Sequence, residues 1–321
     1  MMLSITVSNR RQKDETNRAL ICFFNEKTGK YNIIKENVLP DNLIDTEKYK
    51  PFGCYPKGEF LFVANHDKLI KLDRKGEYVS HITLNNFENP HQIIVTDDVK
   101  CFTNTDKDLI ELTYTDLKEL PTKDKKYVID LKTLDNVKND LYAGPYLLKD
   151  DNHHVNSLCL NDNKIYFCLH NRGSKPSQYF YIDLLTEQIH HICDYGNSSH
   201  NCEIEGDFLY TLNTREACLA CINLKTGKGW ETKLVDEGAE DYLKIDRADY
   251  FLRGLVLTKN HFIIGASLTN TNANNGNSQI LFVDRETKKI VNRYDIEGYN
   301  CVNDIKQIYE IEEIDLEKYL P

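Results

Sequence analysis

The sequence repeats one unit of four short β-strands, and this repeat constrains the fold more than any other feature. Residues 53–84 hold apolar or alternating segments separated by turn residues such as Lys57-Gly58 and Lys75-Gly76. This pattern predicts a four-stranded antiparallel meander. The unit recurs, with other residues, in segments 90–131, 154–194, 200–236 and 253–296. A repeat of about 40–50 residues built from four strands is typical of a β-propeller blade.

The two ends of the chain complete a sixth unit. Segment 303–311 predicts a first strand with nothing after it, and segments 3–9, 18–29 and 30–36 predict a second, third and fourth strand. We therefore expect an all-β, six-bladed β-propeller forming one domain over residues 1–321, its ring closed by N- and C-terminal strands that share one blade. A pair of β-sandwiches or an irregular barrel is the alternative. Segments 38–50, 118–150 and 236–250 are predicted insertions, with a short helix at 237–249.

Charge and cysteine content limit the partners and the compartment. The formal net charge is −10 and the basic residues are scattered, which argues against nucleic acid or an anionic membrane as a partner. No window approaches 18 apolar residues, and the first residues lack a signal-peptide pattern. The ten cysteines then indicate reduced thiols in a cytoplasmic protein. Cys22, Cys159 and Cys168 lie in apolar runs, so we expect them to be buried.

Histidines recur where the predicted first strands begin. In a propeller these strands line the channel, and the loops that lead into them share one face with the loops joining second to third strands. Binding and catalytic residues concentrate on such loops. The first-strand starts are Gly53, His91, His154, His200, Arg253 and Asn303-Asp304.

Three histidines at one repeat position predict a metal site. Three neutral imidazoles with an open fourth position are a usual form of catalytic zinc centre. We expect His91, His154 and His200 to hold a divalent metal, Zn²⁺ first, which would polarise a carbonyl or generate hydroxide. Two alternatives stay open: the histidines contact a ligand directly, or they are channel residues bridged by water and backbone.

Further polar residues are predicted on the same mouth. Arg253 would stabilise an anionic group, and His170 would act as acid or base, with Asp304 as a channel carboxylate. The arginines present planar donors suited to carboxylate or phosphate. The predicted substrate-binding residues are Arg172, Arg215, Asn156, Asn213 and Asn303.

These residues predict a metal-assisted hydrolase or lyase that acts on a small anionic or carbonyl-containing substrate. The sequence has no G-x-S-x-G, P-loop or H-E-x-x-H motif. The alternative is a non-catalytic propeller module that binds a peptide, glycan or protein on the same mouth. A scaffold that binds partners through its outer blade edges is a third interpretation.

Three short segments of the sequence resemble motifs of a known family. They are His154-Val-Asn-Ser-Leu158, His200-Asn-Cys-Glu203 with Leu209-Tyr-Thr-Leu-Asn213, and Phe251-Leu-Arg-Gly-Leu255 followed by Gly265-Ala-Ser267. Over roughly its second half the chain resembles an uncharacterised family of bacterial propeller-like proteins with H-x-N-x-x, P-H-S and F-x-R-G-L motifs, although Ser-Ser-His stands where that family has Pro-His-Ser. By site arrangement alone it resembles the peptidyl-hydroxyglycine amidating lyases. That likeness implies zinc on His91, His154 and His200 beside Arg253.

Overall fold

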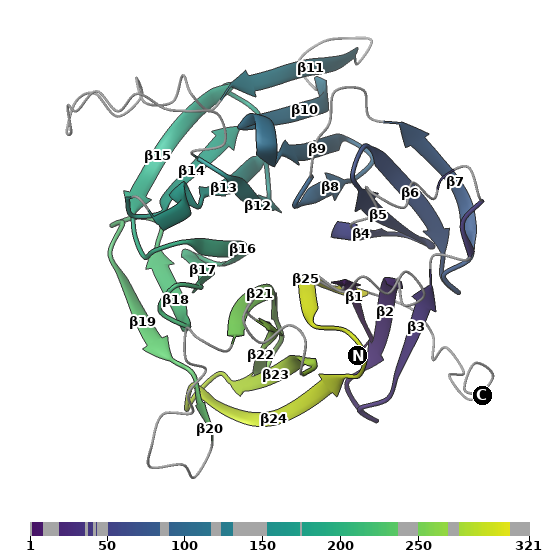
Figure 1. Cartoon of the computed structure of the whole chain (residues 1–321). Helices are drawn as coiled ribbons and strands as arrows, with labels where there is room; N and C mark the ends of the chain where they lie inside the picture. The colour runs from purple at the N-terminus through teal and green to yellow at the C-terminus, as the bar shows by residue number, and fades with distance from the viewer. Residues whose placement is uncertain are drawn as a thin grey trace. The chain divides into compact units, whose positions relative to one another are not determined.

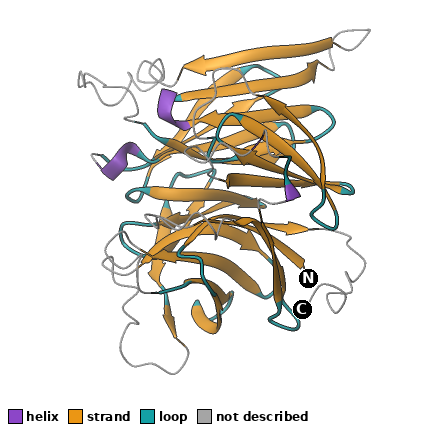
Figure 2. Cartoon of the chain, turned by 45° about the vertical axis from the view of Figure 1, so that its right-hand side comes forward, coloured by secondary structure: helices purple, strands orange, loops and turns teal. Residues whose placement is uncertain are grey.

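Strands account for nearly all of the regular structure in the described chain. The computed structural model describes residues 2–8, 19–35, 38–40, 43, 51–83, 90–116, 123–130, 153–173, 175–236, 250–268 and 276–308. These residues form six antiparallel sheets, and the labelled helical segments among them are two three-residue 3₁₀ turns (Figure 2). The predicted fold class is confirmed: the chain is an all-β, six-bladed β-propeller in which each sheet is one blade.

The chain divides into two compact units of three sheets each. Unit 1 comprises residues 1–86 and 232–321, and unit 2 comprises residues 87–231. The prediction of one domain over residues 1–321 stays a prediction. The predicted insertions lie largely outside the described residues, as does the whole of the predicted helix at 237–249.

One sheet of unit 1 is built from both ends of the chain. In it β25 (Cys301–Ile308) pairs with β1 (Met2–Ser8), which is followed by β2 (Ala19–Asn25) and β3 (Tyr31–Lys35) (Figure 1). The predicted sharing of one blade between the N- and C-terminal strands is therefore confirmed.

The other two sheets of unit 1 follow the repeat. One sheet consists of β4 (Pro51–Lys57), β5 (Phe60–Asn65), β6 (Lys68–Asp73) and β7 (Tyr78–Thr83). The other consists of β21 (Tyr250–Leu257), β22 (His261–Leu268), β23 (Ser278–Asp284) and β24 (Lys289–Ile296), with β20 (Val235–Asp236) added in parallel at the edge.

Unit 2 has three four-stranded sheets in chain order. The first contains β8 (Ile93–Val95), β9 (Val99–Asn104), β10 (Leu109–Asp116) and β11 (Lys123–Asp130), with the 3₁₀ turn η3 (Thr105–Lys107). The second contains β12 (Val155–Asn161), β13 (Lys164–Leu169), β14 (Gln178–Asp183) and β15 (Gln188–Asp194), with η5 (Asn171–Gly173). The third contains β16 (Ser199–Glu205), β17 (Phe208–Asn213), β18 (Cys218–Asn223) and β19 (Gly229–Lys233).

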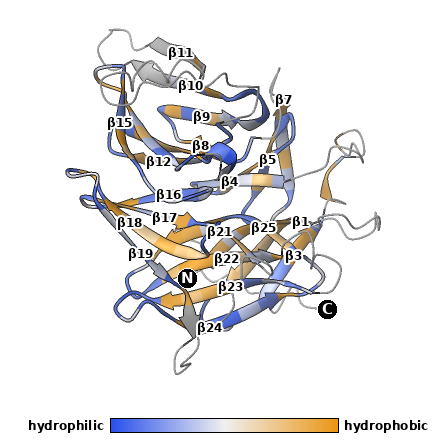
Figure 3. Cartoon of the chain, turned by 60° about the vertical axis from the view of Figure 1, so that its left-hand side comes forward, coloured by the Kyte–Doolittle hydropathy of each residue, from blue (hydrophilic) through white to orange (hydrophobic). Residues whose placement is uncertain are grey.

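Apolar side chains fill the space between neighbouring sheets within each unit. In unit 1 the residues of β1 pack with those of β22 and β23, which are strongly hydrophobic along their length (Figure 3). In unit 2 Tyr166, Tyr179 and Leu209 belong to a cluster between the second and third sheets. Cys22 and Cys168 are fully buried, as predicted, and Cys159 is partly buried. In the part of the chain that is described, no helix is long and apolar enough to cross a membrane.

Candidate functional site: a row of histidines in unit 2

Four imidazole rings of unit 2 form a row. His91 and His154 precede β8 and β12, His170 follows β13, and His200 lies in β16. The ring centroids of His91 and His154 are 5.0 Å apart, those of His154 and His170 are 5.1 Å apart, and those of His170 and His200 are 4.7 Å apart. Each pair meets edge to face. His91 thus lies next to His154, and His170 lies between His154 and His200, so the three predicted ligands belong to one row without all adjoining one another.

The turn that carries His154 is held by a carboxylate from the neighbouring blade. Asp108, which is fully buried after η3, accepts hydrogen bonds from the backbone N–H of His154 at 2.8 Å and of His153 at 3.2 Å. The Thr105 hydroxyl donates to the carbonyl of Val155 at 2.6 Å. His154 has a φ of 50°, in the left-handed region that a non-glycine residue adopts only under such constraint. These contacts of Asp108 and Thr105, called the Asp108 clamp below, therefore offset the backbone strain and orient His154.

Hydrogen bonds to Nδ1 give His200 and His170 opposite tautomers. Nδ1 of His200 lies 3.1 Å from the carbonyl oxygen of Ser198 and 2.9 Å from the Thr214 hydroxyl. Because a carbonyl only accepts, His200 carries its proton on Nδ1, and its Nε2 is the basic nitrogen. Nδ1 of His170 instead accepts the backbone N–H of Arg172 at 3.0 Å. Neutral His170 therefore carries its proton on Nε2, as a donor.

The spacing of neighbouring rings suits shared contacts with one atom. Two imidazoles on a tetrahedral zinc with bonds of about 2.0–2.1 Å have centroids roughly 5 Å apart, close to each adjacent pair of the row. Within the described ranges, no group of three or more His, Cys, Asp or Glu side chains is placed to hold a metal ion. The assignment of zinc to His91, His154 and His200 stays a prediction.

The predicted substrate-binding asparagines of unit 2 make hydrogen bonds that connect structural elements. Asn156 donates through Nδ2 to the carbonyl of Ser199, which joins the second sheet of the unit to the third. Asn213 accepts the backbone N–H of Asn197 at 3.0 Å and donates to the Glu231 carboxylate at 2.8 Å. Both side chains are buried. Their amides orient the loops around His200. The sequence repeat did not reveal these structural contacts.

The two predicted arginines of unit 2 flank η5. Arg172 is exposed, has a φ of 45° and follows His170 by two residues. Arg215 donates from its guanidinium to the carbonyl of Gly173 at 3.2 Å. Gly173 has a φ of +73°, which favours glycine, and a Cβ there would lie 2.1 Å from that guanidinium nitrogen unless the Arg215 side chain moved. Both guanidinium groups thus belong to the loops that carry the histidine row.

Arg253, Asn303 and Asp304 belong to unit 1. Arg253 is half-buried in β21, opposite Gly265 of β22. Asp304 is fully buried, and its carboxylate accepts the backbone N–H of Cys54 at 3.3 Å and of Ile305 at 3.0 Å. The Asn303 amide donates to the Ser8 hydroxyl and to the carbonyl of Pro51. Asn303 and Asp304 therefore connect β25 to β4, and their predicted site roles stay predictions.

Sequence reasoning missed Asp108 and Thr214, which hold two of the histidines. Asp108 contacts a turn 45 and 46 residues away, and Thr214 contacts a histidine 14 residues away. The signal was present in part, because Asp108 closes the loop after a second strand, where every blade carries polar residues. Nothing in the sequence distinguished it from Asp106 in the same loop.

Comparisons with known proteins support the fold alone. No protein-family model and no curated protein matches the chain. Over 95% of its length the chain is similar to 97% of a chain in the crystal structure of a nidogen/laminin complex, with a TM-score of 0.62 and 8% identity. Over 97% it is similar to the whole of a protein of unknown function from Bacteroides caccae, with a TM-score of 0.62 and 11% identity. At such identity these likenesses extend to the propeller fold and no further.

Proposed function

We propose that the histidine row of unit 2 is the active site of a hydrolase or lyase acting on a small anionic or carbonyl-containing substrate. The observation that carries the proposal is the opposite tautomers of His200 and His170, whose ring centroids are 4.7 Å apart. Adjacent acid and base groups of this kind are what general acid–base catalysis requires.

In this proposal the two imidazoles have different roles. Nε2 of His200 takes a proton from water or from a substrate carbon, while its Nδ1–H stays bonded to the Ser198 carbonyl. The Nε2–H of neutral His170 donates a hydrogen bond to the substrate oxygen on which negative charge develops, and the proton that His200 has taken up is returned to the leaving group. Arg172, exposed beside this loop, supplies a positive charge for an anionic substrate. Arg253 and Asp304 keep their predicted catalytic roles only as predictions.

Zinc on His91, His154 and His200 is a separate proposal, because a metal bound to Nε2 of His200 would prevent that nitrogen from acting as the base. The Nδ1–H of His200 points at a backbone carbonyl, the outer contact that metal-bound histidines usually make. Bound zinc would supply a Lewis acid or a hydroxide nucleophile near neutral pH. A cytoplasmic location, with the thiols reduced, is also proposed, since all ten cysteines are free.

The test is hydrolysis of p-nitrophenyl acetate and p-nitrophenyl phosphate by the full chain. We expect His200→Gln and His170→Gln each to lower kcat by roughly 100-fold or more, and the wild type to show a bell-shaped pH–rate profile. The matched control is His191→Gln, on the outer strand β15, where the imidazole bonds Asp194. Metal analysis of the wild type and of a His91/His154/His200→Ala triple variant tests the zinc assignment.

The outcome against an enzyme would be equal rates for the wild type and both variants. The alternative, a binding module for a peptide, glycan or protein, would then be favoured. One similar propeller, crystallised in a nidogen/laminin complex, supports that alternative by its fold alone. A bound zinc that survives the triple substitution would contradict the predicted ligands, and the acid–base roles would be judged from the single variants alone.

A further inference from the structure

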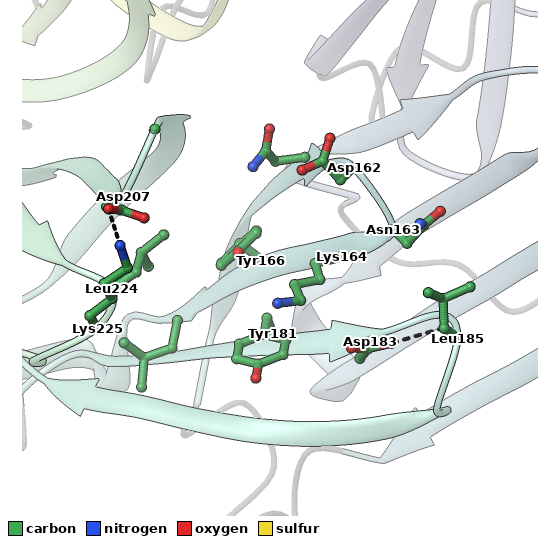
Figure 4. Close-up of a pocket in the computed structure, with 13 residues that line it drawn as sticks. Asp162, Asn163, Lys164, Tyr166, Tyr181, Asp183, Leu185, Asp207, Leu224 and Lys225 are labelled. Carbon is green, nitrogen blue, oxygen red and sulfur yellow. Dashed lines mark hydrogen bonds and ion pairs between the residues drawn. The ribbon is translucent and has the colours of Figure 1, made fainter.

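Unit 2 has a cavity at the ends of its strands that lie opposite the histidine row. Strand β12 begins directly after His154 and ends at Asn161, and the turn that follows it lines a cavity of about 410 Å³. Its walls come from this turn, from β13 to β15, and from the turns that end β16 and β18 of the next blade (Figure 4). The proposed active site uses none of these residues.

Some charged groups of this cavity are already committed to other contacts. Asp207 forms an ion pair with Lys225 on the side of the third sheet. Asp183 accepts the backbone N–H groups of Leu185 and Thr186 at 2.9 and 3.1 Å. The bond from Thr186 is the main reason that the pKa of the Asp183 carboxyl lies below its usual value, with the bond from Leu185 and the charge of Lys164 adding to it. The Asp183 carboxyl thus stays ionised at neutral pH.

The hydroxyl of Tyr166 is the polar group of this cavity that the fold leaves for a ligand. Tyr166 is 6% exposed and lines the cavity, and its hydroxyl makes no hydrogen bond to any residue that the structure describes. Burial raises the pKa of Tyr166, and the neighbouring Tyr181, Asp162 and Asp183 contribute. The hydroxyl is therefore a proton donor at neutral pH.

Lys164 and Asp162 give the cavity one positive and one negative side chain that form no ion pair with a described residue. The Lys164 ammonium lies 4.8 Å from the centre of the Tyr181 ring and, among described residues, forms no ion pair. Asp162 stands at the turn with a φ of 52°, likewise without an ion pair to a described residue. An anionic ligand would be repelled by Asp162 and a cationic ligand by Lys164. A neutral ligand with several hydroxyl groups can accept from Lys164 and Tyr166 and donate to Asp162.

We propose that this cavity binds one neutral saccharide unit, as a free sugar or as the end of a glycan. Its hydroxyls would meet Tyr166, Lys164 and Asp162, and its C–H face would lie on the apolar side chains of Ile192 and Leu224. A mostly preformed cleft with a few convergent polar groups is the usual form of a small-molecule site, and a volume of about 300–1,000 Å³ is typical of such sites.

The test is calorimetric titration of the full chain with the methyl glycosides of glucose, galactose, mannose and N-acetylglucosamine. We expect at least one to bind with a Kd of about 1 mM, as suits a ligand of this size. Tyr166→Phe removes only the unpartnered hydroxyl and keeps the ring in its apolar cluster, and we expect it to weaken binding about 3- to 10-fold. Tyr78→Phe, whose hydroxyl bonds His81 in unit 1, should bind as the wild type does.

Three results would overturn the proposal. The first is that none of the four glycosides binds, and the second is that Tyr166→Phe binds as tightly as the wild type. The third is that inorganic phosphate or arginine amide binds more tightly than any glycoside and loses affinity in Tyr166→Phe. The control is thermal unfolding: equal melting curves for Tyr166→Phe and the wild type show that any loss of affinity does not come from a loss of stability. Hydrolysis by the histidine row is independent of every one of these outcomes.

Discussion

Gly254 shows how a single residue lets two strands of unit 1 approach. Its φ is +74°, and a Cβ there would lie 2.5 Å from the Ile305 side chain and 3.0 Å from the Ile305 backbone nitrogen. Gly254→Ala therefore has a left-handed backbone cost of roughly 1 kcal/mol and an overpacking cost of about 1–3 kcal/mol. We expect the free energy of unfolding in urea to fall by the sum of the two.

Gly58→Ala is the matched control, because Gly58 has a φ of +54° but nothing within 4 Å of an added Cβ. It should lose only the backbone part. Equal losses for the two variants would show that the contact with Ile305 relaxes without cost.

At the residue scale, the sequence predicted which histidines would come together but not how each would act. The repeat placed His91, His154 and His200 at equivalent strand starts, and the structure brings their rings into one row with His170. The tautomers depend on a carbonyl at Ser198 and an amide at Arg172. Backbone groups are present at every residue, so no sequence pattern reveals which of them meets a ring.

At the scale of strands and loops, five first strands carry a β-bulge or a similar irregularity in their pairing. Pairing shifts register at Asn156, Asn201 and Asn303 and between Pro51 and Cys54, near the start of each strand, and at Gly254 in the middle of β21. Bulges bend a strand and redirect its side chains, and they are frequent next to functional sites. Turn residues predicted the strands because they are local signals. The bulges were not predicted, since they depend on pairing with the next strand.

The Asp108 clamp is the loop contact with the clearest expected effect. Asp108→Ala would leave the backbone N–H groups of His153 and His154 without their carboxylate partner. We expect a loss of about 2–3 kcal/mol in the free energy of unfolding and a changed chemical shift of the His154 imidazole in NMR spectra.

Asp98→Ala, in an exposed turn of the same sheet, is the control and should change neither quantity. An unchanged His154 resonance in Asp108→Ala, with stability lost, would show that Asp108 supports the fold without orienting the imidazole.

At the scale of the whole molecule, the ten cysteines are distributed over five of the six sheets. Eight of the ten are buried, and Cys159 and Cys193 are partly buried. The sequence predicted buried, reduced thiols from the apolar runs around Cys22 and Cys168, and these two are fully buried. The cavity opposite the histidine row was beyond sequence reasoning, because it forms only where turns of two neighbouring blades face each other.

The accessibility of these thiols therefore measures the integrity of the five sheets that contain them. The thiolate is the form that reacts with Ellman's reagent, and burial raises the pKa of Cys22, Cys54 and Cys101 and raises that of Cys193 to about 12. In native buffer we expect at most the partly buried Cys159 and Cys193 to react, and slowly. In concentrated guanidinium chloride without reductant, all ten should react, since none is paired.

Across a denaturant series the rise in reactive thiols should coincide with the loss of β-structure in far-UV circular dichroism, because the buried thiols belong to the packed sheets. Fewer than ten reactive thiols after unfolding would indicate disulfides, and rapid reaction of more than two in native buffer would contradict the packing described for these sheets.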